Sequence, residues 1–116
     1  MKIGCNTRIV VDLDDTICRP NHHGSTTHEK YAKAQPIHAT IIWLQNAKAA
    51  GAYIIIHTAR RMLTHKGDLD KIHADVGQVT RDWLDTWQVP FDELVFGKPY
   101  GDIYIDDKAM NVENIW

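Results

Sequence analysis

Residues 9–16 read Ile-Val-Val-Asp-Leu-Asp-Asp-Thr, a run of three branched apolar residues followed at once by carboxylates. The apolar residues 9–11 have the length and composition of a short buried strand. In an extended segment, Asp12 and Asp14 point to the same side, roughly 6.5 to 7 Å apart. Two carboxylates at that spacing are close enough to share a metal and a phosphate group.

The same pattern recurs along the chain. Apolar runs at residues 54–56 and 103–105 each end in polar residues, and a weaker candidate strand covers residues 93–96. Between these runs, apolar residues recur at helical spacing over residues 37–50 and 78–87. Strands that alternate with helices give right-handed crossovers and a parallel sheet covered on both faces. The sequence therefore predicts a small three-layer α/β fold, Rossmann-like, with a parallel sheet of about four strands.

Size and composition limit the function further. A chain of 116 residues is long enough for one domain and too short for two, so we expect residues 1–116 to form a single domain. No apolar run approaches the roughly 20 residues that cross a bilayer, and the N-terminus lacks the features of a secretion signal, which predicts a cytoplasmic protein without membrane contact. The formal net charge of −2 supplies no positive field for a nucleic-acid backbone. Cys5 and Cys18 match no paired metal-ligand spacing and are expected to be thiols.

The polar residues after the predicted strands should converge, because ligands of open α/β sheets bind beyond the carboxyl ends of the strands. Asp12 and Asp14 would meet a second pair there, Asp106 and Asp107. Four carboxylates would repel one another without a cation, and hard oxygen ligands suit Mg²⁺. The sequence thus predicts a divalent metal at this edge of the sheet.

The same residues fit the chemistry of phosphoryl transfer, which needs a nucleophile, positive charge on the phosphate oxygens and a proton for the leaving group. An aspartate can attack phosphorus to form an acyl phosphate, and a neighbouring carboxylic acid can protonate the leaving alkoxide. Lys98 and Thr58 are candidates for holding the phosphate oxygens.

Four motifs occur in the order and strand context of the haloacid dehalogenase superfamily of phosphatases, and nearly the whole chain resembles that superfamily. The motifs are IVVDLDDT, IIIHTAR, FGKP and IYIDDKA. The resemblance implies an aspartyl-phosphate enzyme with Asp12 as nucleophile and Asp14 as general acid and base. Thr58 and Lys98 are implied as the other catalytic residues.

The metal ligands follow from the same resemblance. Asp106, with Asp107 behind it, is implied to hold Mg²⁺ together with the Asp12 carboxylate and the Asp14 backbone carbonyl. Asp15 departs from the pattern, because many members of the superfamily carry glycine at that position, and it adds negative charge near the site.

The substrate is less closely defined. The stretches HTAR, FGKPYGD and YIDDKA are most similar to small capsule-biosynthesis phosphatases, which implies a sugar phosphate of capsule or polysaccharide precursor biosynthesis as the substrate. Arg60 is the candidate for substrate contact, although an arginine after a strand is often only solvated. Members of the superfamily usually select their substrate with an inserted cap domain. The segment of residues 17–35 is shorter than the roughly 40 residues that a self-standing domain needs. We expect a flap loop, no cap, and either large substrates or closure of the site by a second subunit in a homo-oligomer.

Two other functions fit part of the pattern. A nucleotide or polynucleotide-end phosphatase would use the same chemistry, but the acidic net charge weakens that reading. A phosphoacceptor receiver module would carry its phosphorylated aspartate at the end of a middle strand, where this chain has His57-Thr58.

His22, His23 and His28 lie in the predicted flap without the regular spacing of a metal site.

Overall fold

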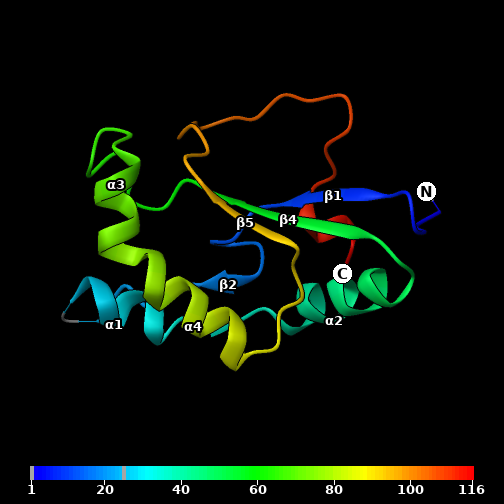
Figure 1. Cartoon of the computed structure of the whole chain (residues 1–116), viewed down its shortest axis with the longest axis horizontal. Helices are drawn as coiled ribbons and strands as arrows, with labels where there is room; N and C mark the ends of the chain where they lie inside the picture. Colours follow the sequence, from blue (N-terminus) through cyan, green and yellow to red (C-terminus); the bar gives the residue numbers. More distant parts are fainter. Residues whose placement is uncertain (1, 25) are drawn as a thin grey trace.

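Five strands form within residues 2–24 and 26–116, which are the residues that the computed structural model describes (Figure 1): β1 (Arg8–Val11), β2 (Cys18–Arg19), β3 (Gln35–Pro36), β4 (Tyr53–Thr58) and β5 (Glu93–Phe96). β1, β4 and β5 make a parallel sheet in the order β1-β4-β5. Its register pairs Ile9 with Ile54 and Ile56 with Leu94. β2 and β3 form a separate antiparallel pair. The predicted parallel sheet is therefore confirmed, with three strands in place of about four.

The helical elements of the described chain are α1 (Thr27–Ala32), α2 (His38–Ala49), α3 (Leu69–Ile72), the π-helical turn η1 (His73–Gly77), α4 (Gln78–Thr86) and the 3-10 turn η2 (Val112–Asn114). α2 and α4 match the predicted helices to within one residue at each end. α3, η1 and α4 follow one another without a break. Gly77 disfavours a helix interior, and in the structure it is the last residue of the π-helical turn η1.

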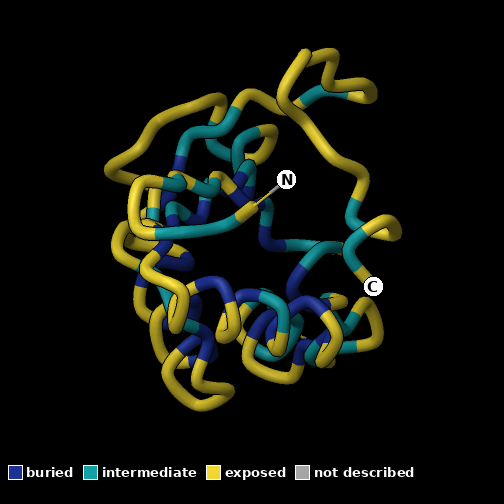
Figure 2. The backbone as a smooth tube through the Cα atoms, turned by 90° about the vertical axis from the view of Figure 1, so that its right-hand side faces the viewer, coloured by how far each residue is buried: buried dark blue, intermediate teal, exposed yellow. Residues whose placement is uncertain are grey.

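Both long helices pack against the same face of the sheet. Ile54 and Ile56 of β4 are fully buried in one core cluster with Leu44 of α2 and Leu84 of α4, and Figure 2 shows the buried backbone concentrated there. The opposite face is open over β1, where Val10 is 64% exposed. Crossovers of one hand that step in the same direction across a sheet place their helices on the same face. The order β1-β4-β5 therefore gives two layers, and the predicted third layer is not formed by the described residues.

The predicted strand at residues 103–105 is also not formed. Ile103 is 77% exposed and Ile105 is 94% exposed, and Figure 1 shows this part of the chain arching past the sheet on the side away from α2 and α4. Only residues 97–102 separate it from β5, whereas a parallel strand ordinarily needs a crossover of a dozen or more residues. The chain instead leaves the sheet after Phe96 and returns to the body of the protein at its end, where the Trp116 indole Nε1 donates to Thr40 Oγ1 at 2.8 Å.

The predicted flap at residues 17–35 is more ordered than a loop, although Ser25 within it lies outside the described residues. It contains β2 and the short helix α1, which begins after Thr26, whose hydroxyl accepts from the Glu29 amide at 3.1 Å. α1 lies beside α4. Tyr31 of α1 is buried, so the flap is packed onto the domain.

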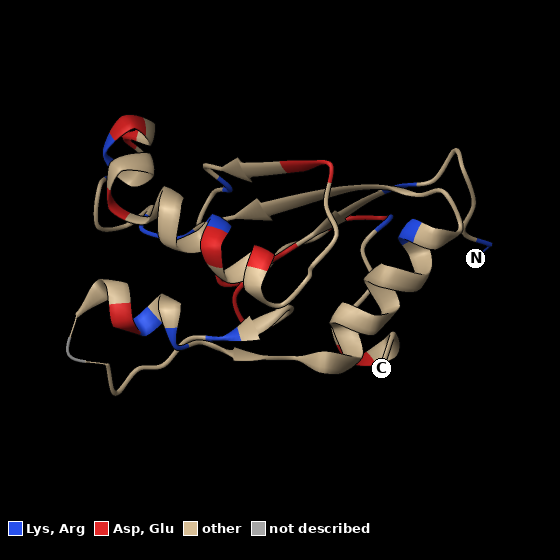
Figure 3. Ribbon diagram, turned by 60° about the horizontal axis from the view of Figure 1, so that its bottom comes forward, with Lys and Arg blue, Asp and Glu red and all other residues tan. Residues whose placement is uncertain are grey.

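No helix in the described part of the chain is both long enough and apolar enough to span a membrane. Basic positions are spread over separate elements rather than gathered along one of them, as Figure 3 shows.

Candidate active site

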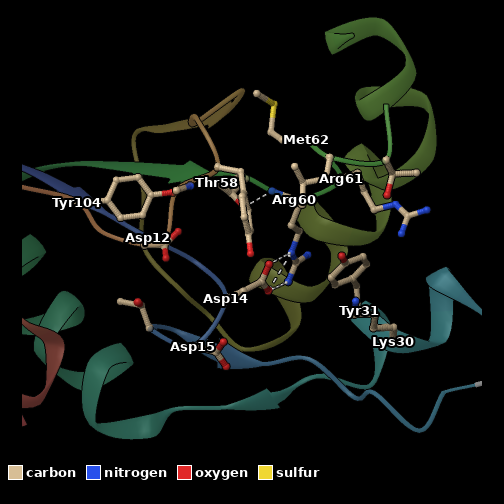
Figure 4. A pocket seen from close by; sticks show the side chains of 16 residues that line it. Asp12, Asp14, Asp15, Lys30, Tyr31, Thr58, Arg60, Arg61, Met62 and Tyr104 are labelled. Carbon is tan, nitrogen blue, oxygen red and sulfur yellow. Dashed lines mark hydrogen bonds and ion pairs between the residues drawn. The ribbon is translucent and has the colours of Figure 1, made fainter. Parts of the chain in front are cut away.

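The carboxyl ends of the three parallel strands meet at one edge of the sheet, and a cavity of about 490 Å³ opens there (Figure 4). Asp12 follows β1 and Thr58 ends β4, and both line the cavity together with Asp14 and Arg60. Lys98, which follows β5, reaches the same edge through its contact with Asp12. All of the predicted catalytic residues are thus brought to one place, as the rule for parallel sheets requires.

Asp12 faces the ammonium group of Lys98. Lys98 Nζ lies 3.6 Å from Asp12 Oδ1, and the Asp12 side chain is 37% exposed. Burial raises the pKa of Asp12; the Leu13 backbone amide and the Lys98 charge lower it, but the net shift is upward. Lys98 Nζ also lies 4.1 Å from the centroid of the Tyr104 ring, which packs the ammonium between a carboxylate and an aromatic face. The pair therefore offers a carboxylate oxygen next to a fixed positive charge.

Lys98 depends on the turn that follows β5. The Lys98 amide donates to the Thr58 carbonyl at 3.1 Å, so the backbone of one strand end is tied to the next. Gly97 has φ of 99°, in the left-handed region, and a Cβ built there would lie 3.0 Å from Leu69 Cδ2. The backbone angle favours glycine here, and a larger residue would also push the Leu69 side chain aside.

Asp14 is held by Arg60 in a two-pronged ion pair. Arg60 Nη2 donates to Asp14 Oδ1 at 2.8 Å, and Arg60 Nε donates to Oδ1 at 3.1 Å and to Oδ2 at 3.0 Å. The Arg60 side chain is fully buried, whereas that of Asp14 is 27% exposed. Burial alone would lower the pKa of Arg60, but the Asp14 carboxylate outweighs it and the pKa is raised. Such a buried guanidinium is permanently charged and fixes the carboxylate in position.

Three further residues contact the Arg60 guanidinium. Nη1 donates to Thr80 Oγ1 at 2.9 Å, Nη2 lies 3.4 Å from Cys18 Sγ, and the Tyr31 ring centroid is 4.1 Å from the guanidinium carbon. The guanidinium nitrogens of Arg60 are therefore all bonded within the protein. The substrate contact predicted for Arg60 is not tested by these contacts and stays a prediction. From the described residues, Asp14 Oδ2 accepts one hydrogen bond, whereas Oδ1 accepts two from Arg60, so Oδ2 is the less engaged oxygen of that carboxylate.

The turn after β1 explains the residue at position 15. Asp15 has φ of 63°, a left-handed backbone angle, and its amide donates to the Cys18 carbonyl at 2.6 Å. Glycine adopts this angle without strain and aspartate tolerates it better than most residues do. Position 15 is therefore one whose backbone angle suits glycine, and Asp15 is held in it by the hydrogen bond to Cys18.

The two remaining predicted metal ligands lie elsewhere. Asp106 and Asp107 are exposed on the segment that follows residue 105, and Asp106 Oδ1 accepts from the Lys108 amide at 2.8 Å. That backbone hydrogen bond, more than any other cause, lowers the pKa of Asp106. The cavity supplies carboxylate oxygens of the kind Mg²⁺ prefers, from Asp12 and Asp14. Within residues 2–24 and 26–116, however, no three His, Cys, Asp or Glu side chains come together as a metal site, so half of the predicted set is assembled.

Several residues at the site carry no signal in the sequence. Thr80, Tyr31 and Cys18 surround Arg60 but come from three different elements, and none of them belongs to a motif. His22, His23 and His28 belong to no metal cluster in the described part of the flap. Only the three-dimensional arrangement could reveal the first group, since its contacts join Arg60 to residues 20 to 42 positions away in sequence.

Comparisons with known proteins give a relative and a fold. The chain is 33% identical to a structural-genomics target from Vibrio cholerae whose crystal structure superposes with a TM-score of 0.82, over 94% of this chain and 86% of that one. The chain belongs to the same family as that protein. No model of a known protein family matches the sequence, and no curated protein matches it.

Two other solved structures share the fold at lower identity. A chain of the Pnkp1/Rnl/Hen1 RNA repair complex is 16% identical, with a TM-score of 0.57 over 94% of this chain and 29% of that one. A second structure of the Pnkp1/Rnl/Hen1 complex gives 18% identity and a TM-score of 0.60, over 87% of this chain and 30% of that one. At these identities the likeness concerns the fold alone.

Proposed function

We propose that this protein is a phosphatase that transfers the phosphoryl group of a phosphate monoester to Asp12 and then to water. The observation that carries the proposal is the pairing of Asp12 with Lys98 at 3.6 Å, at the edge of a cavity that also holds a second, rigidly oriented carboxylate. A nucleophile, a positive charge and an acid-base group are the protein components that this reaction needs.

In the first step, an Asp12 carboxylate oxygen attacks phosphorus, the bond from phosphorus to the ester oxygen breaks, and the leaving alkoxide takes a proton from Asp14. Asp14 Oδ2 is the oxygen best suited to carry that proton, because Oδ1 already accepts two hydrogen bonds from Arg60. Lys98 compensates the charge that builds up on the phosphate oxygens, and the Thr58 hydroxyl lines the same cavity.

In the second step, water attacks the phosphorus of the acyl phosphate. Asp14 takes a proton from that water, the bond between phosphorus and the Asp12 oxygen breaks, and inorganic phosphate leaves. Asp12 is then again the free carboxylate and Asp14 is again the protonated acid with which the first step began, so one water is consumed for each ester cleaved. Arg60 keeps Asp14 oriented in both steps, because the guanidinium group of an arginine is not deprotonated in proteins.

Mg²⁺ remains part of the proposal. When bound, it would supply further positive charge against the phosphate and the acidic cavity wall, with Asp12 and the Asp14 backbone carbonyl as ligands within the cavity. Asp106 and Asp107 would add the ligands implied by the resemblance, although they lie outside the cavity in the structure.

The substrate class rests on the sequence resemblance, which favours a sugar phosphate of polysaccharide precursor biosynthesis. A nucleotide or polynucleotide-end phosphatase is the second candidate, supported by the shared fold with a chain of an RNA repair complex. A net charge of −2 and dispersed basic positions favour the first candidate.

The proposal is tested by release of inorganic phosphate from an aryl phosphate, with Mg²⁺ and with excess chelator. We expect turnover with Mg²⁺ that the chelator abolishes and that added Mg²⁺ restores. Turnover that persists at full rate in chelator would remove the metal from the proposal, and no phosphate release from any monoester would remove the activity.

A further inference from the structure

The cavity is larger than the proposed reaction requires. Its volume of about 490 Å³ falls within the roughly 300 to 1,000 Å³ typical of sites that enclose a whole small-molecule ligand. Beyond Asp12, Asp14 and Thr58, its wall is completed by Lys30, Tyr31 and other side chains to which the proposed mechanism gives no role. In the proposed reaction, these side chains line the space for the part of the substrate to which the reacting phosphate is attached.

Arg61 is one of these wall residues. It follows Arg60 directly, yet its side chain goes to the cavity wall rather than to Asp14. Its φ of 61° lies in the left-handed region, a strained conformation for an arginine. A strained residue on the wall of a candidate active site indicates that its position is functionally constrained.

The Arg61 side chain is anchored by one nitrogen only. Nε donates to Asp75 Oδ2 at 2.9 Å, and the same oxygen contacts His65 Nε2 at 2.8 Å. Burial would raise the pKa of Asp75, but the hydrogen bonds from His65 and Arg61 outweigh it and lower the pKa. Among the described residues, Nη1 and Nη2 of Arg61 make no hydrogen bond, and the side chain is 24% exposed. An anchored guanidinium with two unused terminal nitrogens is arranged to bind an anion in a two-pronged manner.

A second cation lines the same wall. Figure 4 shows Lys30 and Arg61 on the side of the view opposite Asp12, with Tyr31 between them. Lys30 Nζ lies 5.3 Å from the centroid of the Tyr31 ring. The cavity therefore has carboxylates at one end, for the reacting phosphate, and basic side chains at the other.

We propose that Arg61, with Lys30, binds a second phosphate group of the substrate, one that does not react. The substrate class is then a phosphate monoester that carries a second phosphate group elsewhere in the molecule. This inference rests on the proposed function for the reacting phosphate, and it assigns specificity to Arg61 rather than to Arg60.

The test compares substrates that differ only in the second anionic group. Two matched pairs separate the sources of that group: fructose 6-phosphate with fructose 1,6-bisphosphate, and adenosine 3′-monophosphate with adenosine 3′,5′-bisphosphate. We expect the wild type to favour the doubly anionic member of at least one pair in kcat/KM, by about tenfold, chiefly through a lower KM. In Arg61→Gln this preference should fall to about twofold or less.

A control variant and a binding measurement complete the test. Lys66→Gln removes a positive charge from an exposed residue of the same loop that does not line the cavity, so it should keep the preference. Arg61→Lys retains the charge without the two-pronged geometry and should keep part of it. Calorimetric binding of the same four compounds to Asp12→Asn, with and without Arg61→Gln, reports the second site without turnover.

Equal kcat/KM and equal binding of both members of both pairs by the wild-type and Asp12→Asn proteins would overturn the inference. A preference that survives Arg61→Gln would overturn it as well and would leave Arg61 as a clamp between its loop and Asp75. Failure of the proposed function is distinguishable, because the wild type would then release no phosphate from an aryl phosphate whatever the binding results.

Discussion

At the scale of single residues, the positive charge beside the proposed nucleophile is the most direct target. Lys98→Ala removes the ammonium 3.6 Å from Asp12. We expect kcat for an aryl phosphate to fall by about 10²-fold or more, because such a group stabilises charge that develops in the transition state. Steady-state kinetics measure this, with Lys71→Ala as the control, since that lysine is exposed and does not line the cavity. A loss within about threefold would make Lys98 a bystander.

Arg60 is expected to act through Asp14. Arg60→Gln breaks a buried ion pair, which should lower the free energy of unfolding by about 2 to 3 kcal/mol, less than a fully buried pair because Asp14 is partly exposed. Denaturant titration measures that loss. Activity should fall more for alkyl phosphates than for activated aryl phosphates, whose leaving groups need little protonation.

The dependence on the leaving group distinguishes this role from a purely structural one. Arg60→Lys keeps a charge near Asp14 without the two-pronged geometry and should recover part of the alkyl phosphate activity. Arg81→Gln, which removes an arginine whose Nη1 bonds only the Gly77 carbonyl at 3.3 Å, is the matched control. An equal loss on both kinds of substrate in Arg60→Gln would limit Arg60 to stability.

Cys18 should be chemically inert in the folded protein. Burial, followed by the Asp14 charge, raises the pKa of its thiol to about 12, whereas Cys5 is an exposed free cysteine. Because the thiolate is the reactive form and a raised pKa delays its appearance to higher pH, almost none exists at pH 8. We expect iodoacetamide at pH 8 to modify Cys5 alone, and both cysteines once the protein is unfolded. Modification of Cys18 at a rate similar to that of Cys5 would contradict the structure.

At the scale of elements, the segment after β5 separates the sequence pattern from the structure. Residues 103–105 form an apolar run like that of a buried strand, but their side chains are exposed and they lie outside the sheet. We expect the amides of Tyr104 and Ile105 to exchange with solvent within seconds, while those of Ile54 and Ile56 in the central strand exchange slowly. Hydrogen exchange read by NMR measures both. Slow exchange at Tyr104 and Ile105 would show that the segment pairs with the sheet, as its sequence predicts.

At the scale of the whole molecule, the sequence predicts the site better than its surroundings. Asp12, Thr58 and Lys98 could be placed together because each follows a parallel strand, and the ends of such strands meet. The support of Asp14 could not be predicted, because Arg60 also needs Thr80 and Tyr31, which the packing of α4 and α1 brings to it.

The layers were predicted wrongly for a related reason. Strand and helix patterns give the elements but not the direction in which each crossover steps across the sheet, and that direction decides whether helices cover one face or two. A fourth strand would have required residues 103–105 to pair with an edge of the sheet, and a third layer would have required helices on the side of the sheet opposite α2 and α4. In the structure that side remains exposed at Val10.

The central claim is that Asp12 carries the phosphoryl group, and rapid acid quench followed by intact-mass measurement tests it most directly. The wild type and Asp14→Asn, each mixed with an activated aryl phosphate, should gain one phosphoryl group that tandem fragmentation locates on Asp12. Asp14→Asn should keep it longer, because it lacks the base for the attacking water. Asp12→Asn should gain none. A phosphoryl group on Asp12→Asn, or on any residue other than Asp12 in the wild type, would contradict the account.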